Sequence, residues 1–156
     1  GFFMEPPISF DASRSLAELE EEGWTFDPEE FDAPRHAHGL VTKPVRRLTP
    51  AELMQLIRWR VSLRFTVPAA ITRMMGDPFL KAGAHEGDLL VALLEAGKSF
   101  WRANYDLWCA MVDLLAKAIT DVAARVEAEE AGDYLPQFLG DDFMAAVMHF
   151  RDIHEA

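Results

Sequence analysis

The feature that most constrains this chain is an apolar stripe of helical period between about residues 104 and 129. Its members recur at spacings of three and four, so they share one face of an α-helix. A helix of this length needs other elements against which to bury that face. The stripe therefore predicts a helical fold, and it comprises Leu107, Met111, Leu114, Leu115, Ala118, Ile119, Val122 and Val126.

Other helices are marked by signals at their ends. Thr49 precedes Pro50, and Glu52 follows three residues after Thr49, which is the pattern of a capping box at a helix start. Ser15 and Glu18 repeat this pattern at the start of a short helix over residues 15–22. Further helices are expected from near Pro68 to Gly76, from Leu89 to Ala96 with Asp88 as the cap, and from Asp141 or Asp142 onward.

The first 48 residues differ from the rest because prolines interrupt them repeatedly. We expect a Pro-rich, extended N-terminal arm over residues 1–48, packed on a helical body over residues 49–156. The length of 156 residues suits one domain with one sizeable core. The prediction is a single all-α domain of about five to six helices. Its expected core contains Leu53, Ile57, Leu114, Ile119 and Val122.

Cysteine content and hydropathy indicate the compartment. Cys109 is the only cysteine, so no intramolecular disulfide can form, as is usual in a reducing compartment. No window approaches 18 apolar residues, and the N-terminus lacks the basic and apolar regions of a signal peptide. We therefore expect a cytoplasmic protein that does not contact a membrane.

No arrangement of residues predicts catalysis. His36 and His38 form a lone His-x-His in a Pro-bracketed stretch, without further ligands at a zinc-like spacing. Cys109 has apolar sequence neighbours, so buried packing is a better interpretation than a reactive nucleophile. The sequence also contains no phosphate-binding glycine loop and no dinucleotide fingerprint. We expect no enzymatic activity, no metal and no cofactor.

The net charge of -11 is unevenly distributed along the chain. Residues 1–34 carry a net charge of -9, residues 35–81 carry +7, and residues 82–156 carry -9. Acidic side chains on and after the long helix would suit a basic protein partner, because complementary charge steers encounter. The candidate binding residues are Asp106, Asp113, Asp121, Glu127, Glu129, Glu130 and Asp133.

The basic middle of the chain supports an alternative. Arg58, Arg60 and Arg64 are interleaved with Trp59 and Phe65, a composition that binds single-stranded nucleic acid by stacking and charge. The overall negative charge opposes this interpretation, because it repels phosphates. Nucleic-acid binding therefore remains the alternative to protein binding, and the main interpretation expects no nucleic acid.

A set of short motifs occurs in a fixed order along the first two thirds of the chain. They are Lys43-Pro44, Leu48–Leu53, Ile57, Leu63, Val67–Ala70, Gly87–Leu90 and Ser99–Trp101, preceded by the Ser15–Glu20 stretch with Trp24. In this order the motifs resemble the immunity proteins of bacterial contact-dependent growth inhibition systems. Arg58, Ser62 and the pair His85-Glu86 depart from the family pattern, because they stand where glycines and an aromatic-Pro pair are expected.

The resemblance implies a small cytoplasmic protein that binds a cognate toxin domain and neutralises it. Toxins of this kind are often basic nucleases, which agrees with the acidic charge of the chain. The matching residues correspond to helix caps and core positions. The resemblance therefore assigns no binding residue, because immunity surfaces are expected to vary with the toxin.

Overall fold

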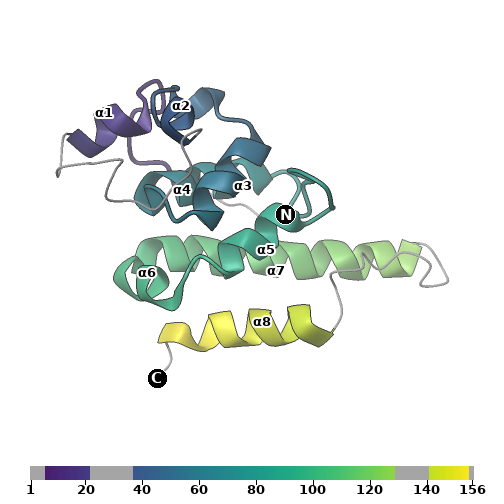
Figure 1. Ribbon diagram of the computed structural model, residues 1–156. Coiled ribbons are helices and arrows are strands. Elements are labelled where there is room, and N and C mark those ends of the chain that lie inside the picture. Colours follow the sequence, from purple (N-terminus) through teal and green to yellow (C-terminus); the bar gives the residue numbers. More distant parts are fainter. Residues whose placement is uncertain (1–5, 22–36, 129–140, 155–156) are drawn as a thin grey trace.

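The computed structural model describes residues 6–21, 37–128 and 141–154, and the secondary structure of these residues consists of helices, with no strand among them (Figure 1). The all-α prediction is confirmed. The helices outnumber the five to six expected, chiefly because short ones also form before residue 49. The elements are α1 (Leu16–Glu21), α2 (Ala37–Val41), the 3-10 helix η1 (Val45–Arg47), α3 (Pro50–Arg58), α4 (Leu63–Met74), α5 (Asp88–Leu94), α6 (Lys98–Ala103), α7 (Tyr105–Ala128), α8 (Asp141–Arg151) and the 3-10 helix η2 (Asp152–His154).

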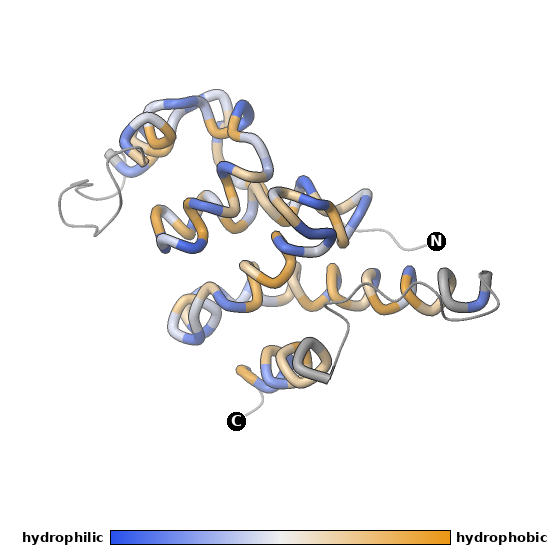
Figure 2. The backbone as a smooth tube through the Cα atoms, turned by 45° about the vertical axis from the view of Figure 1, so that its right-hand side comes forward, coloured by the Kyte–Doolittle hydropathy of each residue, from blue (hydrophilic) through white to orange (hydrophobic). Residues whose placement is uncertain are grey.

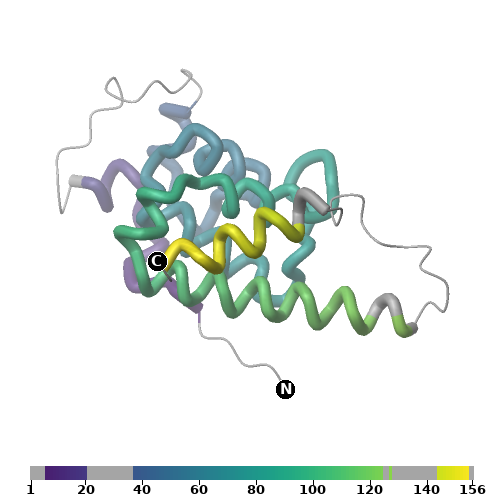
Figure 3. Tube along the Cα trace, turned by 90° about the horizontal axis from the view of Figure 1, so that it is seen from below, coloured from purple at the N-terminus to yellow at the C-terminus, as the bar shows by residue number. Residues whose placement is uncertain are grey.

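The helices stack in layers around α7. Helices α1 to α4 form the upper layer in Figure 1, α7 runs beneath them, and α8 lies below α7 and runs in the opposite direction. Contacts between α4 and α7 and between α5 and α8 join the layers. Seen from below, α7 follows one edge of the molecule (Figure 3). Helix α7 is therefore covered by α4 on one side and neighboured by α8 on another, and part of its surface is left to solvent.

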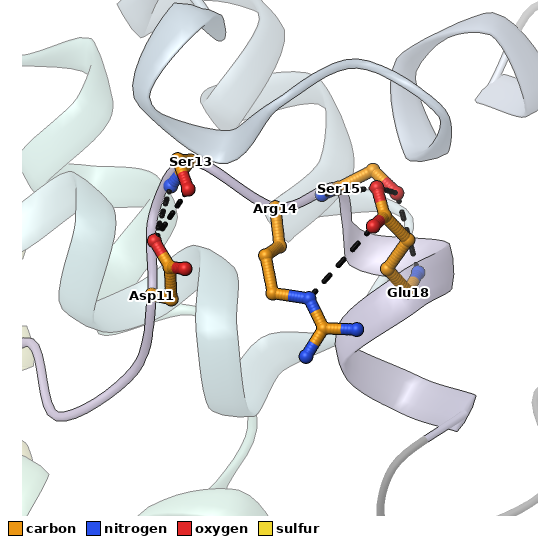
Figure 4. Close-up of polar contacts among 5 residues, drawn as sticks. All are labelled: Asp11, Ser13, Arg14, Ser15 and Glu18. Atoms are coloured by element: carbon orange, nitrogen blue, oxygen red, sulfur yellow. Dashed lines mark hydrogen bonds and ion pairs between the residues drawn. The ribbon is translucent and has the colours of Figure 1, made fainter.

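Both predicted capping boxes are present. In α3 the Glu52 amide donates to the Thr49 hydroxyl at 3.1 Å, and the Thr49 amide donates to the Glu52 carboxylate at 2.9 Å. In α1 the Glu18 amide donates to Ser15 Oγ at 3.2 Å, and Ser15 N donates to Glu18 Oε1 at 3.3 Å (Figure 4). Arg14 adds an ion pair with Glu18. These reciprocal bonds satisfy amides that the helix itself leaves without acceptors.

The extended character of the N-terminal arm is not confirmed, since α1, α2 and η1 occupy much of its described part. The amide of Val45 donates to the carbonyl of Arg14 at 3.0 Å, and the amide of Arg46 donates to the carbonyl of Ala12 at 2.9 Å. These bonds hold the residues before α1 against the residues that lead into α3. Three aromatic residues of this arm, Trp24, Phe26 and Phe31, lie outside the described residues.

Helix α4 starts earlier than predicted. It begins at Leu63 rather than near Pro68, which lies inside the helix as its sixth residue. The chain reverses between α3 and α4 through two residues with positive φ, Arg60 at 58° and Ser62 at 49°. Pro68 has no amide to donate to the carbonyl of Arg64, so one hydrogen bond of the helix is missing at this point.

The predicted role of Asp88 is also different in the structure. Gly87, with φ of 84°, precedes α5, and Asp88 is the first residue of the helix rather than its cap. Its carboxylate accepts amides from Ala82 at 2.8 Å and Gly83 at 2.8 Å, and also from the next two residues of the loop. Asp88 therefore closes the loop before α5.

The buried side chains form two clusters rather than one. The larger cluster joins α4 to α8 and contains Ile57 and Leu114, whereas Leu53 belongs to a second cluster built around α1, η1 and α3. Val122 is only partly buried, and Ile119 is 42% exposed. The expectation that Ile119 and Leu53 share a core with Leu114 is therefore wrong. Figure 2 shows hydrophobic positions recurring along α7 up to its last turns, and the exposure of Ile119 shows that not all of them are buried.

Aromatic residues fasten the end of α8 to the start of α7. Trp108 Nε1 donates to the carbonyl of Phe150 at 3.0 Å, and His154 Nε2 lies 2.8 Å from the carbonyl of Trp101. The Trp101 and Phe150 rings meet edge to face with centroids 4.9 Å apart. The opposite ends of α7 and α8 lack such a fastening among the described residues.

Candidate functional site

The acidic candidates on α7 lie mainly in one row. Asp106, Asp113 and Glu127 are exposed, and their spacings of seven and fourteen residues place them on one face of the helix. Thr120, also exposed, occupies the remaining seven-residue position. We call Asp106, Asp113, Thr120 and Glu127 the acidic row. It forms a negatively charged surface at the edge of the molecule.

The other acidic candidates do not belong to this row. Asp121 is half-buried and points about 100° away from Thr120, because each helical residue turns by that angle. On this side of α7, Lys117 donates through Nζ to the carbonyl of Met75 at the end of α4. Glu129, Glu130 and Asp133 lie outside the described residues.

The arginines of the nucleic-acid alternative share an exposed region. Arg58 ends α3, Arg60 lies in the reversal, Arg64 is in the first turn of α4, and all three are exposed. The aromatic residues between them are less accessible, since Phe65 is buried and Trp59 is half-buried. The guanidinium of Arg64 lies 5.5 Å from the centre of the Phe65 ring. The basic side chains are presented to solvent without the open aromatic faces on which bases would stack.

The described residues contain no group of three or more His, Cys, Asp or Glu side chains placed to hold a metal ion. His38 is exposed, and His36 lies outside the described residues. Cys109 is half-buried rather than buried, and its contact with Tyr105 raises the pKa of that phenol. Within the part of the chain that the structure covers, no helix is both long enough and apolar enough to cross a membrane.

The structure also shows an apolar groove between α7 and α8 that the sequence did not predict. The groove has a volume of about 80 Å³ and is partly open to solvent. Ile119 lines it from α7 and Met144 lines it from α8. The available signal was the width of the apolar stripe on α7, which exceeds what one covering layer can bury. The lining residues are Phe79, Leu115, Ala118, Ile119, Val122, Met144 and Val147.

Comparison with known proteins adds a family match. A family model described as CDI immunity proteins, where CDI is contact-dependent growth inhibition, matches residues 18–110. This range is more than half of the 156 residues and extends from α1 into the first turns of α7. Searches of the curated proteins and of the solved structures find no match to the chain.

Proposed function

The chain belongs to the family of CDI immunity proteins, and from this membership we propose that it binds and neutralises a cognate toxin domain in the cytoplasm. It acts by binding and not by catalysis, because the bound protein covers the active surface of the toxin. The family match carries this proposal. The toxin is expected to be basic, because the acidic row presents a surface that attracts a positively charged protein.

The exposure of the acidic row favours a role in association with the toxin rather than in stabilising the fold. Asp106, Asp113 and Glu127 are exposed. Charges at an exposed rim raise the association rate, whereas buried anchors determine how long a complex lasts. Exposed charges contribute little to the free energy of unfolding. The row can therefore be neutralised without damage to the fold.

The test measures association of the protein with the toxin domain encoded by the neighbouring open reading frame. Changing Asp113→Asn together with Glu127→Gln should slow association by about tenfold at low ionic strength and reduce its dependence on salt. Glu95→Gln with Asp152→Asn is the matched control, because it removes two charges from exposed positions outside the row. Both variants should keep the melting temperature of the parent.

The outcomes separate the parts of this proposal. Equal association rates for the row variant and the control would show that the row is not the approach surface. Absence of any binding between the parent protein and the toxin domain would refute the immunity function itself. Failure of the immunity protein to protect cells that express the toxin would do the same.

The nucleic-acid alternative is tested by titration with single-stranded RNA at increasing salt. If Arg58, Arg60 and Arg64 neutralise phosphates, the logarithm of the affinity should fall linearly with the logarithm of the salt concentration. Changing the three arginines to glutamine should then abolish binding. If no binding of single-stranded RNA is detected at about 50 mM salt, this alternative is excluded.

A further inference from the structure

Large apolar side chains are exposed on only two of the described helices. Tyr105 is 57% exposed, Ile119 42%, Met144 44% and Met148 63%, and no other large hydrophobic residue of the described chain is as open. The first two belong to α7 and the last two to α8. Exposed apolar patches of this kind mark interaction surfaces, whereas single exposed residues are ordinary.

On α7 these residues belong to a continuous seam. From Tyr105 to Ala123, residues without charge recur at alternating spacings of four and three, the repeat by which one helix presents a narrow face to another. Each member is exposed or half-buried, and although Val112 also packs against the core, most of this face remains accessible. We call this set the α7 seam: Tyr105, Cys109, Val112, Ala116, Ile119 and Ala123.

Helix α8 extends the seam sideways. Ile119 and Met144 line the groove of about 80 Å³ from opposite helices, and Met148 lies one turn further along α8. At the other end Tyr105 meets the His154 ring edge to face, with centroids 5.1 Å apart. Figures 1 and 3 show α7 and α8 side by side and running in opposite directions. The seam, the groove and the two methionines therefore form one apolar strip.

The acidic residues beside the strip indicate which kind of partner can bind there. Asp106, Asp113 and Thr120 each directly follow a seam residue, and Glu127 continues the same seven-residue repeat. In paired helices these flanking positions face the flanking positions of the partner and set its charge. A second copy of this chain would bring acidic rows and net charges of -11 together, which repulsion opposes. The occupant must instead carry basic flanks.

We propose that the α7 seam, with Met144 and Met148, docks an amphipathic helix of the toxin whose apolar stripe lies in the seam and whose basic flank pairs with the acidic row. The small side chains of Cys109, Ala116 and Ala123 allow the helix to approach closely. The groove beside Ile119 receives an apolar side chain of the helix, as hot-spot pockets do. This inference rests on the proposed function and specifies how the toxin is held.

The first test introduces a charge into the seam. Ala116→Arg should weaken binding of the neighbouring toxin domain by more than about tenfold, mainly by faster dissociation. Ala146→Arg is the matched control, because it adds the same charge to an exposed alanine of α8 that lies about 160° round that helix from Met144 and from Met148. This control should weaken binding of the toxin domain by less than about threefold. Both positions are exposed, so both variants should keep the parent's melting temperature.

The second test identifies the occupant chemically. Cys109 is the only cysteine and belongs to the seam, so a maleimide-benzophenone reagent attached to it samples what docks there. Photo-crosslinking in the complex followed by mass spectrometry should capture a toxin segment of helical period with Lys or Arg beside its apolar stripe. Capture of an acidic or irregular toxin segment would overturn the proposal, and so would capture of a second copy of this protein.

The two proposals fail differently. If the toxin domain binds but Ala116→Arg and Ala146→Arg weaken its binding equally, the docking surface is elsewhere and the immunity function stands. If the toxin domain does not bind the parent protein, the proposed function fails first. If Ala116→Arg instead converts a dimer of the free protein into a monomer in light scattering, the seam is a self-interface and the inference is overturned.

Discussion

At the scale of single residues, Glu20 is the least expected feature. Its side chain is fully buried in α1, and no described residue donates a hydrogen bond to its carboxylate. Burial raises the pKa of Glu20, while the nearby Ser62 hydroxyl and Arg64 guanidinium oppose the shift without bonding to the carboxylate. Nothing in the sequence pattern indicated this, because Glu20 lies beside other acids at the end of a short helix.

Replacing this carboxyl should stabilise the protein at neutral pH. The folded pKa lies above the ordinary value of 4.5, so the folded state loses stability as pH rises from about 4.5 through the folded pKa. Glu20→Gln removes that loss, and we expect its free energy of unfolding to exceed the parent's by about 1 to 3 kcal/mol at pH 7. Urea titrations at pH 7 and pH 4 test this. A difference that does not shrink at pH 4 would show that ionisation is not the cause.

Leu114 and Ile119 separate the predicted core from the observed one. Both belong to the apolar stripe of α7, but Leu114 is fully buried, whereas Ile119 is 42% exposed. Leu114→Ala should lower the free energy of unfolding by about 2 to 5 kcal/mol, because it removes packed methyl groups and leaves a cavity. Ile119→Ala should cost no more than about 1 kcal/mol. Equal losses of the free energy of unfolding in a denaturant titration would contradict the exposure of Ile119.

At the scale of elements, the loop before α5 depends on one side chain. Burial alone would raise the pKa of Asp88, but the amides of Ala82, Gly83 and His85 together lower it below the ordinary value. A lowered pKa gives stability above the unfolded value of 3.8 that is lost as pH falls through the folded pKa. The carboxylate thus holds the loop most firmly in its ionised form.

Asp88→Ala should destabilise the protein by about 2 to 4 kcal/mol at pH 7, because four amides lose a charged acceptor. The difference in free energy of unfolding between Asp88→Ala and the parent should become smaller below pH 3.8. Asp88→Asn is the control, since its amide oxygen keeps part of the hydrogen bonding. Chemical denaturation across this pH range tests the prediction, and a constant difference would contradict it.

Signals local to the chain predicted elements well. The capping boxes at Ser15 and Thr49 are present, and the long helix from about residue 104 to 129 is observed as α7. Helix α4 could not be placed from its proline, because the reversal that starts it depends on positive φ at Arg60 and Ser62. Ordinary residues adopt that conformation under tertiary constraint, which composition does not reveal.

The candidate surface was predictable only in part. Exposed acids at Asp106, Asp113 and Glu127 follow from helical period alone. The opening between α7 and α8 depends on where α8 packs, and a single helix pattern carries no information about its neighbours. For that reason Ile119 was expected in the core, although it lines the groove.

At the scale of the whole molecule, the excess of acidic residues should make stability depend on salt. The ion pairs that the structure describes, such as Lys43 with Glu52 at 2.8 Å, are few beside a net charge of -11. Raising NaCl from about 10 to 150 mM shortens the screening length from about 30 to 8 Å and weakens the general repulsion. The melting temperature should therefore rise. A fall would mean that attractive pairs outweigh repulsion in this fold.

The packing around Trp108 makes the fluorescence of this indole sensitive to how α8 contacts α7. The indole is bonded to Phe150, meets the His154 ring with centroids 4.8 Å apart and stacks on Tyr105 at 5.7 Å. Indole emission responds to the polarity of its surroundings. The fluorescence of Trp108 should thus change when α8 leaves α7 or when another molecule covers Tyr105.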